Sequence, residues 1–458
     1  MSSIEKFERL ITPMGTAARI GAVASLFLVA ACGAAPGTET ANESSNTTGD
    51  QAALKADIGL LPEQARKEVA PLVSKDWLGH GLGISPGKWK LIGEMKLAKP
   101  NEEFVRPTVD ESLPNAPDLH PNSIVIGDPA TKKMYSVDLD PKELGELSKV
   151  LQAAGYANPT IKDSQAGNLG ADGANVQKGW SGGVDNRNDL GDGATTQDAW
   201  PYRTIGQLKN DGQSSTTNGF CTATFVASAG DADTRYIITA SHCMWSTSTG
   251  AYQDPDFYPR QDRCLNNTGA AVAGCSQAPY GIWDGGQWMM MQYFVDNCAG
   301  LPALGAECMA NDIAVMRVHR QSGSFPGAQG LAYWGKTDLD GVLKYHRGYP
   351  NCGGSGDPVP ASPKVCLPRT LYGDGAFSIG SGLSVDGDGW PRRYKFSADI
   401  SPGHSGGPSY FSSGGNHYVF GTASTEDCSG SSCTGTQVNT MRPMNAFFFN
   451  ASLSFMGL

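Results

Sequence analysis

The placement of cysteine constrains this chain more than any other feature of its sequence. Eleven cysteines occur in 458 residues, and none lies from position 33 to position 220. An even set of ten after residue 220 indicates up to five disulfides, formed in an oxidising compartment. We expect nearest-neighbour pairing, although the sequence alone leaves the connectivity open, and no C-x-x-C spacing indicates a metal site. The neighbouring couples are Cys221 and Cys243, Cys264 and Cys275, Cys298 and Cys308, Cys352 and Cys366, and Cys428 and Cys433.

The first 55 residues have the pattern of an export signal followed by a tether. Basic residues up to Arg19 precede the apolar run IGAVASLFLVAACG, which is too short for a comfortable membrane span and ends in small residues. Cys32 follows LVAA, which resembles a bacterial lipobox, so residues 1–31 are predicted to be a signal peptide and Cys32 a lipidation site. An ordinary secretory signal is the alternative. The polar residues 32–55 are predicted to be a flexible tether, and the protein to be exported, either anchored to the bacterial envelope by lipid or released.

Residues 56–165 contain no cysteine and are predicted to form a small α+β domain. The stretch NSIVIGDPATKKMYSVDL predicts a hairpin, and DPKELGELSKVLQAAGY predicts a helix with Asp140 as its N-cap. Residues 166–197 are rich in Gly, Asn and Asp, which is typical of an exposed linker that is easily cut. We favour a pro-region that assists folding or covers a cleft, with a permanent accessory domain as the alternative.

Residues 198–458 consist of short apolar segments separated by Gly, Ser and Asp turns, a pattern that predicts an all-β sandwich or barrel. The chain has 58 glycines and only 17% charged residues, which favours loops and short strands over long helices. Its net charge of −10 argues against a nucleic-acid partner. We also expect no metal and no cofactor.

Three stretches in this region carry side chains suited to acyl transfer. RYIITASHC ends an alternating strand at His242, NDIAVMRV places Asp312 before another, and SPGHSGGP surrounds Ser405 with glycines. A serine hydroxyl needs an adjacent base, which His242 would supply, and Asp312 would fix the tautomer of that base. Backbone N–H groups of a glycine turn can bind an oxyanion, so Gly403 and Ser405 are predicted to form that hole.

The order of these residues along the chain separates the possible folds. In an α/β-hydrolase the Asp and His follow the nucleophile, whereas here His417 is the only histidine that follows Ser405, and it lies in a Gly/Ser-rich turn. The subtilisin order would place the Asp before the His. The order His242, Asp312, Ser405 is that of chymotrypsin.

TASHC, NDIAVMRV and GHSGGP resemble the three motifs of the chymotrypsin-like serine proteases, over residues 198–458. The resemblance implies two six-stranded antiparallel β-barrels, here preceded by the small α+β domain. It also implies a catalytic triad of His242, Asp312 and Ser405, with Gly403 and Ser405 at the oxyanion hole, in a monomeric endopeptidase acting on polypeptides. PYRTIGQL and DISPGHSGGP most resemble the bacterial branch that includes the glutamyl endopeptidases.

Departures from the family pattern bear on regulation and specificity. His404 replaces the Asp that pairs with a freed N-terminus in the animal enzymes, and we interpret it as a structural substitute. Asp399 matches a position that gives preference for Arg or Lys, whereas Ala423 stands where glutamyl endopeptidases have a His, so neither specificity is favoured. Two rival functions remain open: a catalytically inactive, protease-like binding module on the cell surface, and an esterase, which the chain order disfavours.

Overall fold

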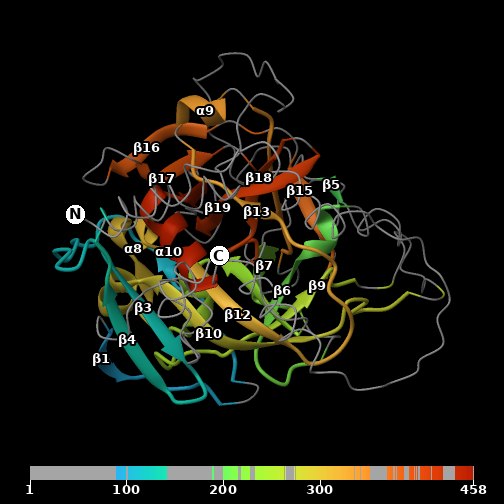
Figure 1. Ribbon diagram of the computed structural model, residues 1–458, viewed down its shortest axis with the longest axis horizontal. Coiled ribbons are helices and arrows are strands. Elements are labelled where there is room, and N and C mark those ends of the chain that lie inside the picture. The colour runs from blue at the N-terminus through green and yellow to red at the C-terminus, as the bar shows by residue number, and fades with distance from the viewer. Residues whose placement is uncertain are drawn as a thin grey trace, which may run out of the picture. The chain divides into compact units, whose positions relative to one another are not determined.

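The structure is a computed structural model, and Figure 1 shows its elements. It describes residues 89–99, 102–140, 142, 188–189, 200–214, 218–226, 233–262, 264, 273, 275–334, 336–340, 342–350, 369–374, 377, 379–385, 391–396, 398, 400, 403–413, 415–425 and 439–456. The predicted signal peptide, lipidation site Cys32, tether and nearly all of the linker lie outside these residues. None of the helices in the described ranges is both long enough and apolar enough to cross a membrane.

Six antiparallel strands close into a barrel. They run in the order β10–β12–β8–β7–β6–β9, and β9 returns to β10 through the pair Phe257 and Trp283. A mostly β fold with one closed six-stranded barrel is therefore confirmed. The strands are β6 (Ile205–Lys209), β7 (Cys221–Val226), β8 (Thr234–Thr239), β9 (Asp256–Pro259), β10 (Trp283–Met291) and β12 (Ala314–Arg320).

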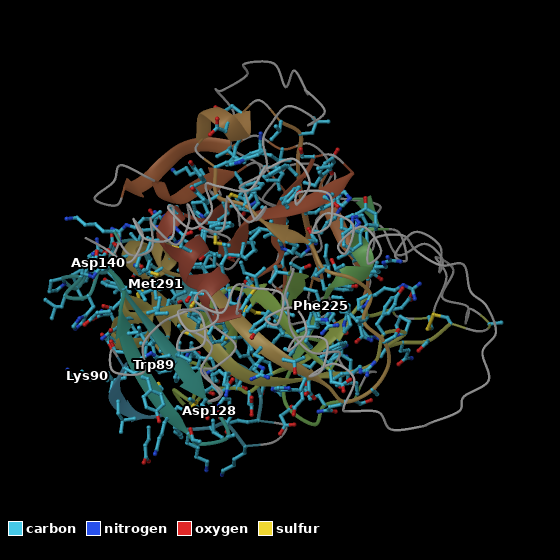
Figure 2. All side chains as sticks on the ribbon, in the orientation of Figure 1. Trp89, Lys90, Asp128, Asp140, Phe225 and Met291 are labelled. Atoms are coloured by element: carbon cyan, nitrogen blue, oxygen red, sulfur yellow. A yellow bond between two sulfur atoms is a disulfide. The ribbon has the colours of Figure 1, made fainter. Side chains whose placement is uncertain are left out.

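Most side chains of the barrel strands are buried, and they pack on both faces of the sheet. Successive side chains point to opposite faces of a strand. In β8, Ile237 accordingly packs in one hydrophobic cluster, while Tyr236 and Ile238 pack in another. Phe225 belongs to the cluster of Ile237 (Figure 2), and its ring stands edge-on to the rings of Phe257 and Trp283, each at 4.9 Å between centroids. Burial of each such side chain stabilises the fold by roughly 1.5–3 kcal/mol.

A second sheet is formed by strands that follow the barrel in sequence, together with β5, which precedes it. Its strands run in the order β16–β17–β20–β19–β18–β14–β15–β5, and β13 pairs in parallel with β19. The described strands form an open order, so the second closed barrel stays a prediction. They are β5 (Asn188–Asp189), β13 (Gly330–Leu331), β14 (Lys344–Gly348), β15 (Tyr372–Asp374), β16 (Ile379–Val385), β17 (Pro391–Phe396), β18 (Pro408–Ser413), β19 (Asn416–Thr425) and β20 (Asn439–Pro443).

The hairpin expected before the barrel is present, as β3 (Ser123–Asp128) and β4 (Lys133–Asp138). On its other side β3 pairs with β10 (Figure 1), and β4 pairs with β1 (Trp89–Glu94). A strand as apolar as SIVIG needs partners on both edges and cover on both faces. The described residues therefore extend the barrel sheet, and a separate α+β domain over 56–165 stays a prediction.

The described helices are short and lie between the strands or after the last of them. Phe448 N, in the first turn of α10, donates to Asn445 Oδ1 at 2.8 Å, which satisfies a helix-start amide. Asp140 Oδ1 accepts from Lys142 N at 2.8 Å, as an N-cap would, but the rest of the helix predicted there lies outside the described residues. The helices are η3 (Tyr202–Thr204), η4 (Ser241–Met244), α7 (Gln292–Asn297), α8 (Ala306–Ala310), α9 (Lys336–Asp340) and α10 (Ala446–Met456).

Three disulfides join neighbouring cysteines in the expected couples. They are Cys221–Cys243, Cys264–Cys275 and Cys298–Cys308. The other two couples, Cys352 with Cys366 and Cys428 with Cys433, lie outside the described residues.

Burial of His417 makes stability sensitive to acid. Its ring packs near Tyr410 and Trp200, and burial lowers its pKa to about 4. The unfolded chain binds this proton at a pKa of about 6.5. Stability should therefore fall as the pH drops from about 6.5 towards 4, because only the unfolded state gains the proton in that window.

We expect His417→Gln to reduce this loss, measured by urea unfolding at pH 7 and pH 4.5. The exposed His120→Gln variant is the control and should follow the parent chain. An equal loss of stability in the His417→Gln variant would contradict the assignment.

Candidate active site

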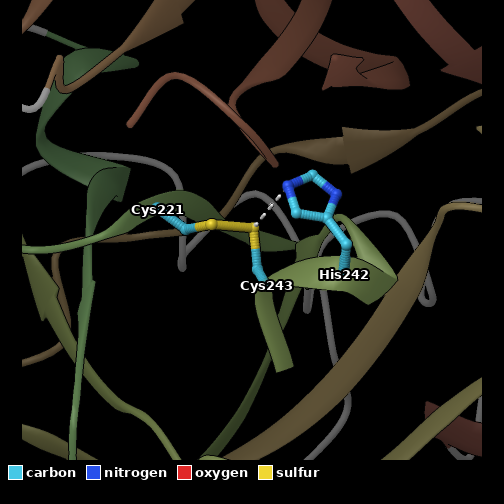
Figure 3. A group of neighbouring side chains, drawn as sticks. All are labelled: Cys221, His242 and Cys243. Atoms are coloured by element: carbon cyan, nitrogen blue, oxygen red, sulfur yellow. Dashed lines mark hydrogen bonds between the residues drawn. A yellow bond between two sulfur atoms is a disulfide. The ribbon is translucent and has the colours of Figure 1, made fainter. Parts of the chain in front are cut away.

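His242 is held at the end of a buried strand. Strand β8 runs into the short helix η4, which carries His242 and Cys243. The disulfide from Cys243 to Cys221 ties η4 to β7 (Figure 3), and Ser241 Oγ donates to the carbonyl oxygen of Ile313 at 2.8 Å. These links fix the backbone that presents the imidazole.

Asp312 contacts the imidazole of His242 and is fully buried. Its Oδ1 accepts from His242 N at 2.8 Å, and its Oδ2 lies 2.7 Å from His242 Nδ1. Ser424 Oγ donates to the same Oδ2 at 2.5 Å. A buried carboxylate requires such donors, and an ionised Asp312 places the proton of His242 on Nδ1, which leaves Nε2 as the acceptor.

Ser405 lies in a turn held by strands of both sheets. Thr222 N, in β7, donates to the Ser405 carbonyl at 2.8 Å, and Thr222 Oγ1 donates to the Gly403 carbonyl at 2.7 Å. From β19, the Ala423 carbonyl accepts from Gly406 N at 2.8 Å. Gly403 and Gly406 have φ of 95° and 78°, in the left-handed region that glycine tolerates.

His242 and Ser405 line one cavity of about 170 Å³. In the described residues no hydrogen bond joins the two side chains: Ser405 Oγ lies 3.4 Å from the Ser424 carbonyl oxygen, and His242 Nε2 lies 3.8 Å from Cys243 Sγ (Figure 3). Contacts between nucleophile and base are often loose without substrate. The structure therefore brings His242 and Asp312 into direct contact and places Ser405 across the same cavity.

The other predicted site residues fall in different places. Asp399 lies outside the described residues. Ala423 is buried in β19, where its backbone pairs with Gly406 and Gly407, and it does not line the cavity. His404 is also buried, 5.6 Å from the His346 ring, and it does not line the cavity either.

Some residues of the site were missed from the sequence. Ser424 follows Ala423 in YVFGTAST, and strand alternation could have indicated that it points to the other face. Thr425 and residues 106–109 also line the cavity. No local sequence signal connects 106–109 to His242, which lies more than 130 positions later.

The neighbouring sulfurs do not make this a metal site. Cys221, His242 and Cys243 lie close together (Figure 3). Both sulfurs are used in one disulfide, however, so neither offers the thiolate that a metal binds.

The turn around Ser405 should be intolerant of a side chain at Gly406. A Cβ there would lie 2.1 Å from Thr239 Oγ1 and 2.4 Å from the Thr222 carbonyl oxygen. Gly415 has a similar φ of 79° with nothing within 4 Å, so Gly415→Ala isolates the backbone cost, about 1–2 kcal/mol. We expect Gly406→Ala to lose at least about 2 kcal/mol more than Gly415→Ala in denaturant unfolding; equal losses would contradict this packing.

No protein-family model and no curated protein matches this chain. Solved structures that resemble it are a glutamyl endopeptidase in complex with MPD (16% identity, 59% of this chain and 97% of that one, TM-score 0.37) and a thermostable serine protease AL20 from an extremophilic microorganism (17%, 55% and 95%, TM-score 0.34). A third is the protease Anisep from Arthrobacter nicotinovorans (21%, 53% and 89%, TM-score 0.31). At these TM-scores the resemblance identifies neither a family nor an activity.

Proposed function

We propose that this protein is an exported serine endopeptidase. The observation that carries the proposal is the buried Asp312 carboxylate, which binds both the backbone and the ring of His242 while Ser405 lines the same cavity. Such a carboxylate fixes the tautomer of a general base and stabilises the imidazolium that forms during acyl transfer.

The reaction follows from this arrangement. The reaction requires Ser405 Oγ to leave the Ser424 carbonyl and reach His242 Nε2, which would take its proton as Oγ attacks the peptide carbonyl. The oxyanion forms beside the Gly403 and Ser405 amides, and donors of this kind are each worth about 3–4 kcal/mol of barrier. His242 then gives the proton to the leaving amine, and water hydrolyses the acyl-enzyme by the same route in reverse.

Export is proposed from the three disulfides, since such bonds persist in oxidising compartments. The same proposal includes lipidation of Cys32, with the protein either anchored to the envelope or released from it, and a monomeric state. The rival function is an inactive binding module, which would keep this geometry without turnover.

Ser405→Ala should lower kcat/KM for an unfolded polypeptide by at least about 10³-fold, because the nucleophile is lost. It should also abolish labelling by a fluorophosphonate. His404→Asn, one residue away, is the matched control: its ring is buried beside His346, outside the cavity, and the variant should stay within about tenfold of the parent. The binding module would be favoured if neither the parent chain nor the Thr108→Pro chain described below takes any label or cleaves any substrate.

We further propose that residues 102–116, here called the strap, cover the active site in the full chain. Residues 106–109 line the cavity with His242 and Ser405, whose exposed fractions are only 2% and 5%. On one side Thr247 N donates to the Val105 carbonyl at 3.0 Å, and Phe104 stacks on Phe220 at 4.2 Å.

The strap is also bound through its residues 108–111. Its strand β2 (Thr108–Val109) pairs in parallel with β11 (Ala303–Leu304). Thr108 N donates to the Pro302 carbonyl at 2.9 Å, and Glu111 pairs with Arg393 at 2.9 Å. These contacts support a cover over the cleft, whereas the β3–β4 hairpin is paired into the barrel. Activation would then require release of the strap, not removal of all of residues 56–165.

Thr108→Pro should release the strap by removing the N–H that binds Pro302. We expect the full chain to be labelled by a fluorophosphonate at least about fivefold faster, with little change in the urea midpoint. Thr108→Ala keeps that N–H, loses only the hydroxyl contact, and should remain near the parent. Equal labelling rates in the parent and the Thr108→Pro chain would rule out the cover.

A further inference from the structure

A cluster of carboxylates lies away from the cavity, where three barrel strands meet. Asp256 begins β9, Asp284 is the second residue of β10, and Asp211 follows β6 by two residues. The pairs Lys209 with Asp256 and Phe257 with Trp283 place these positions side by side. One oxygen of each of the three carboxylates lies within 4.8 Å of the others.

An unsatisfied buried oxygen distinguishes this cluster from ordinary surface acids. Asp256 is only 3% exposed, and its Oδ1 is buried with no hydrogen-bond partner in the described part of the chain. The Gly212 N–H and the Asp284 carboxyl approach the same side chain. Buried charged oxygens are normally paired or bound to a metal, because an unpaired one is costly.

The charges around the cluster leave it short of positive compensation. Asp254 adds further negative charge nearby, and His319 faces Asp284. Lys209 interacts electrostatically with Asp256, and its Nζ also lies over the Tyr258 ring at 4.4 Å and donates to the Ser214 carbonyl at 3.3 Å.

We propose that Asp211, Asp256 and Asp284 form a Ca²⁺ site. Calcium binds carboxylate, carbonyl and water oxygens at 2.3–2.6 Å in flexible geometry, so two of its ligands lie at most about 5 Å apart. The 4.8 Å limit on the three oxygens fits that range. Mg²⁺ requires strict octahedral geometry and usually keeps several waters with one or two carboxylates, so a set of three carboxylates suits Ca²⁺ better.

The position of the site gives the ion a structural role. The barrel closes where β9 meets β10 through the single pair Phe257 and Trp283. An ion bound by Asp256 of β9, Asp284 of β10 and Asp211 after β6 would link all three strands at that closure. Bound Ca²⁺ would therefore stabilise the closed barrel by mass action.

The test uses the full chain carrying Ser405→Ala, which prevents self-digestion and does not touch the cluster. After dialysis against EDTA, 1 mM Ca²⁺ should raise the Tm by several degrees, and 1 mM Mg²⁺ should raise it much less. Tb³⁺ should bind with luminescence sensitised by Trp283 or Tyr258, and Ca²⁺ should displace it.

Asp256→Asn should abolish the Tm response and the Tb³⁺ signal, yet match or exceed the parent Tm in EDTA because it removes a buried charge. Asp211→Asn, nearer the solvent, gives a second variant that should fold and bind at least about tenfold more weakly. Asp338→Asn, exposed in α9, is the control and should respond like the parent. No Ca²⁺ response in the parent, an equal response to Mg²⁺, or an unchanged response in both cluster variants would overturn the proposal.

Discussion

The buried carboxylate of Asp312 is the interaction on which the rest of the site depends. Its oxygens accept hydrogen bonds from His242, in the helix η4 that follows barrel strand β8, and from Ser424 in the second sheet. This one carboxylate therefore links the two sheets. Without those donors a fully buried carboxylate would be too costly to keep ionised. The same hydrogen bonds that make Asp312 tolerable therefore also fix the orientation and the tautomer of the imidazole.

Thr222 has a similar organising role for the nucleophile. From a single position in β7 it binds the carbonyls of Gly403 and Ser405, and its hydroxyl accepts from Tyr349 N at 2.9 Å. The turn that carries Ser405 thus precedes strand β18 of the second sheet, while two of its carbonyls are hydrogen-bonded to strand β7 of the barrel. The cavity is also lined by residues 106–109 of the strap, whose backbone is hydrogen-bonded at Val105 and at Thr108.

Asp312 and Asp256 are both buried carboxylates whose oxygens require donors or a cation, and the two differ in how that requirement is met. Both carboxylates are almost completely buried in or beside the barrel. Asp312 is satisfied by three protein donors, whereas Asp256 keeps an oxygen with no partner in the described part of the chain and faces other carboxylates. The first arrangement supports proton transfer, and the second supports binding of a cation.

The sequence by itself determined the local features: the β3–β4 hairpin and the alternating strands that deliver His242 and Asp312. These depend on periodicity and short separations, which a single chain displays directly. Only the tertiary structure decided that Ser424 binds Asp312, that residues 106–109 line the cavity, and that Asp211, Asp256 and Asp284 converge. Each of these contacts joins segments that are distant in sequence. Strand pairing brings together the strap and the carboxylate cluster, and a hydrogen bond from the second sheet reaches Asp312; no local pattern encodes these contacts.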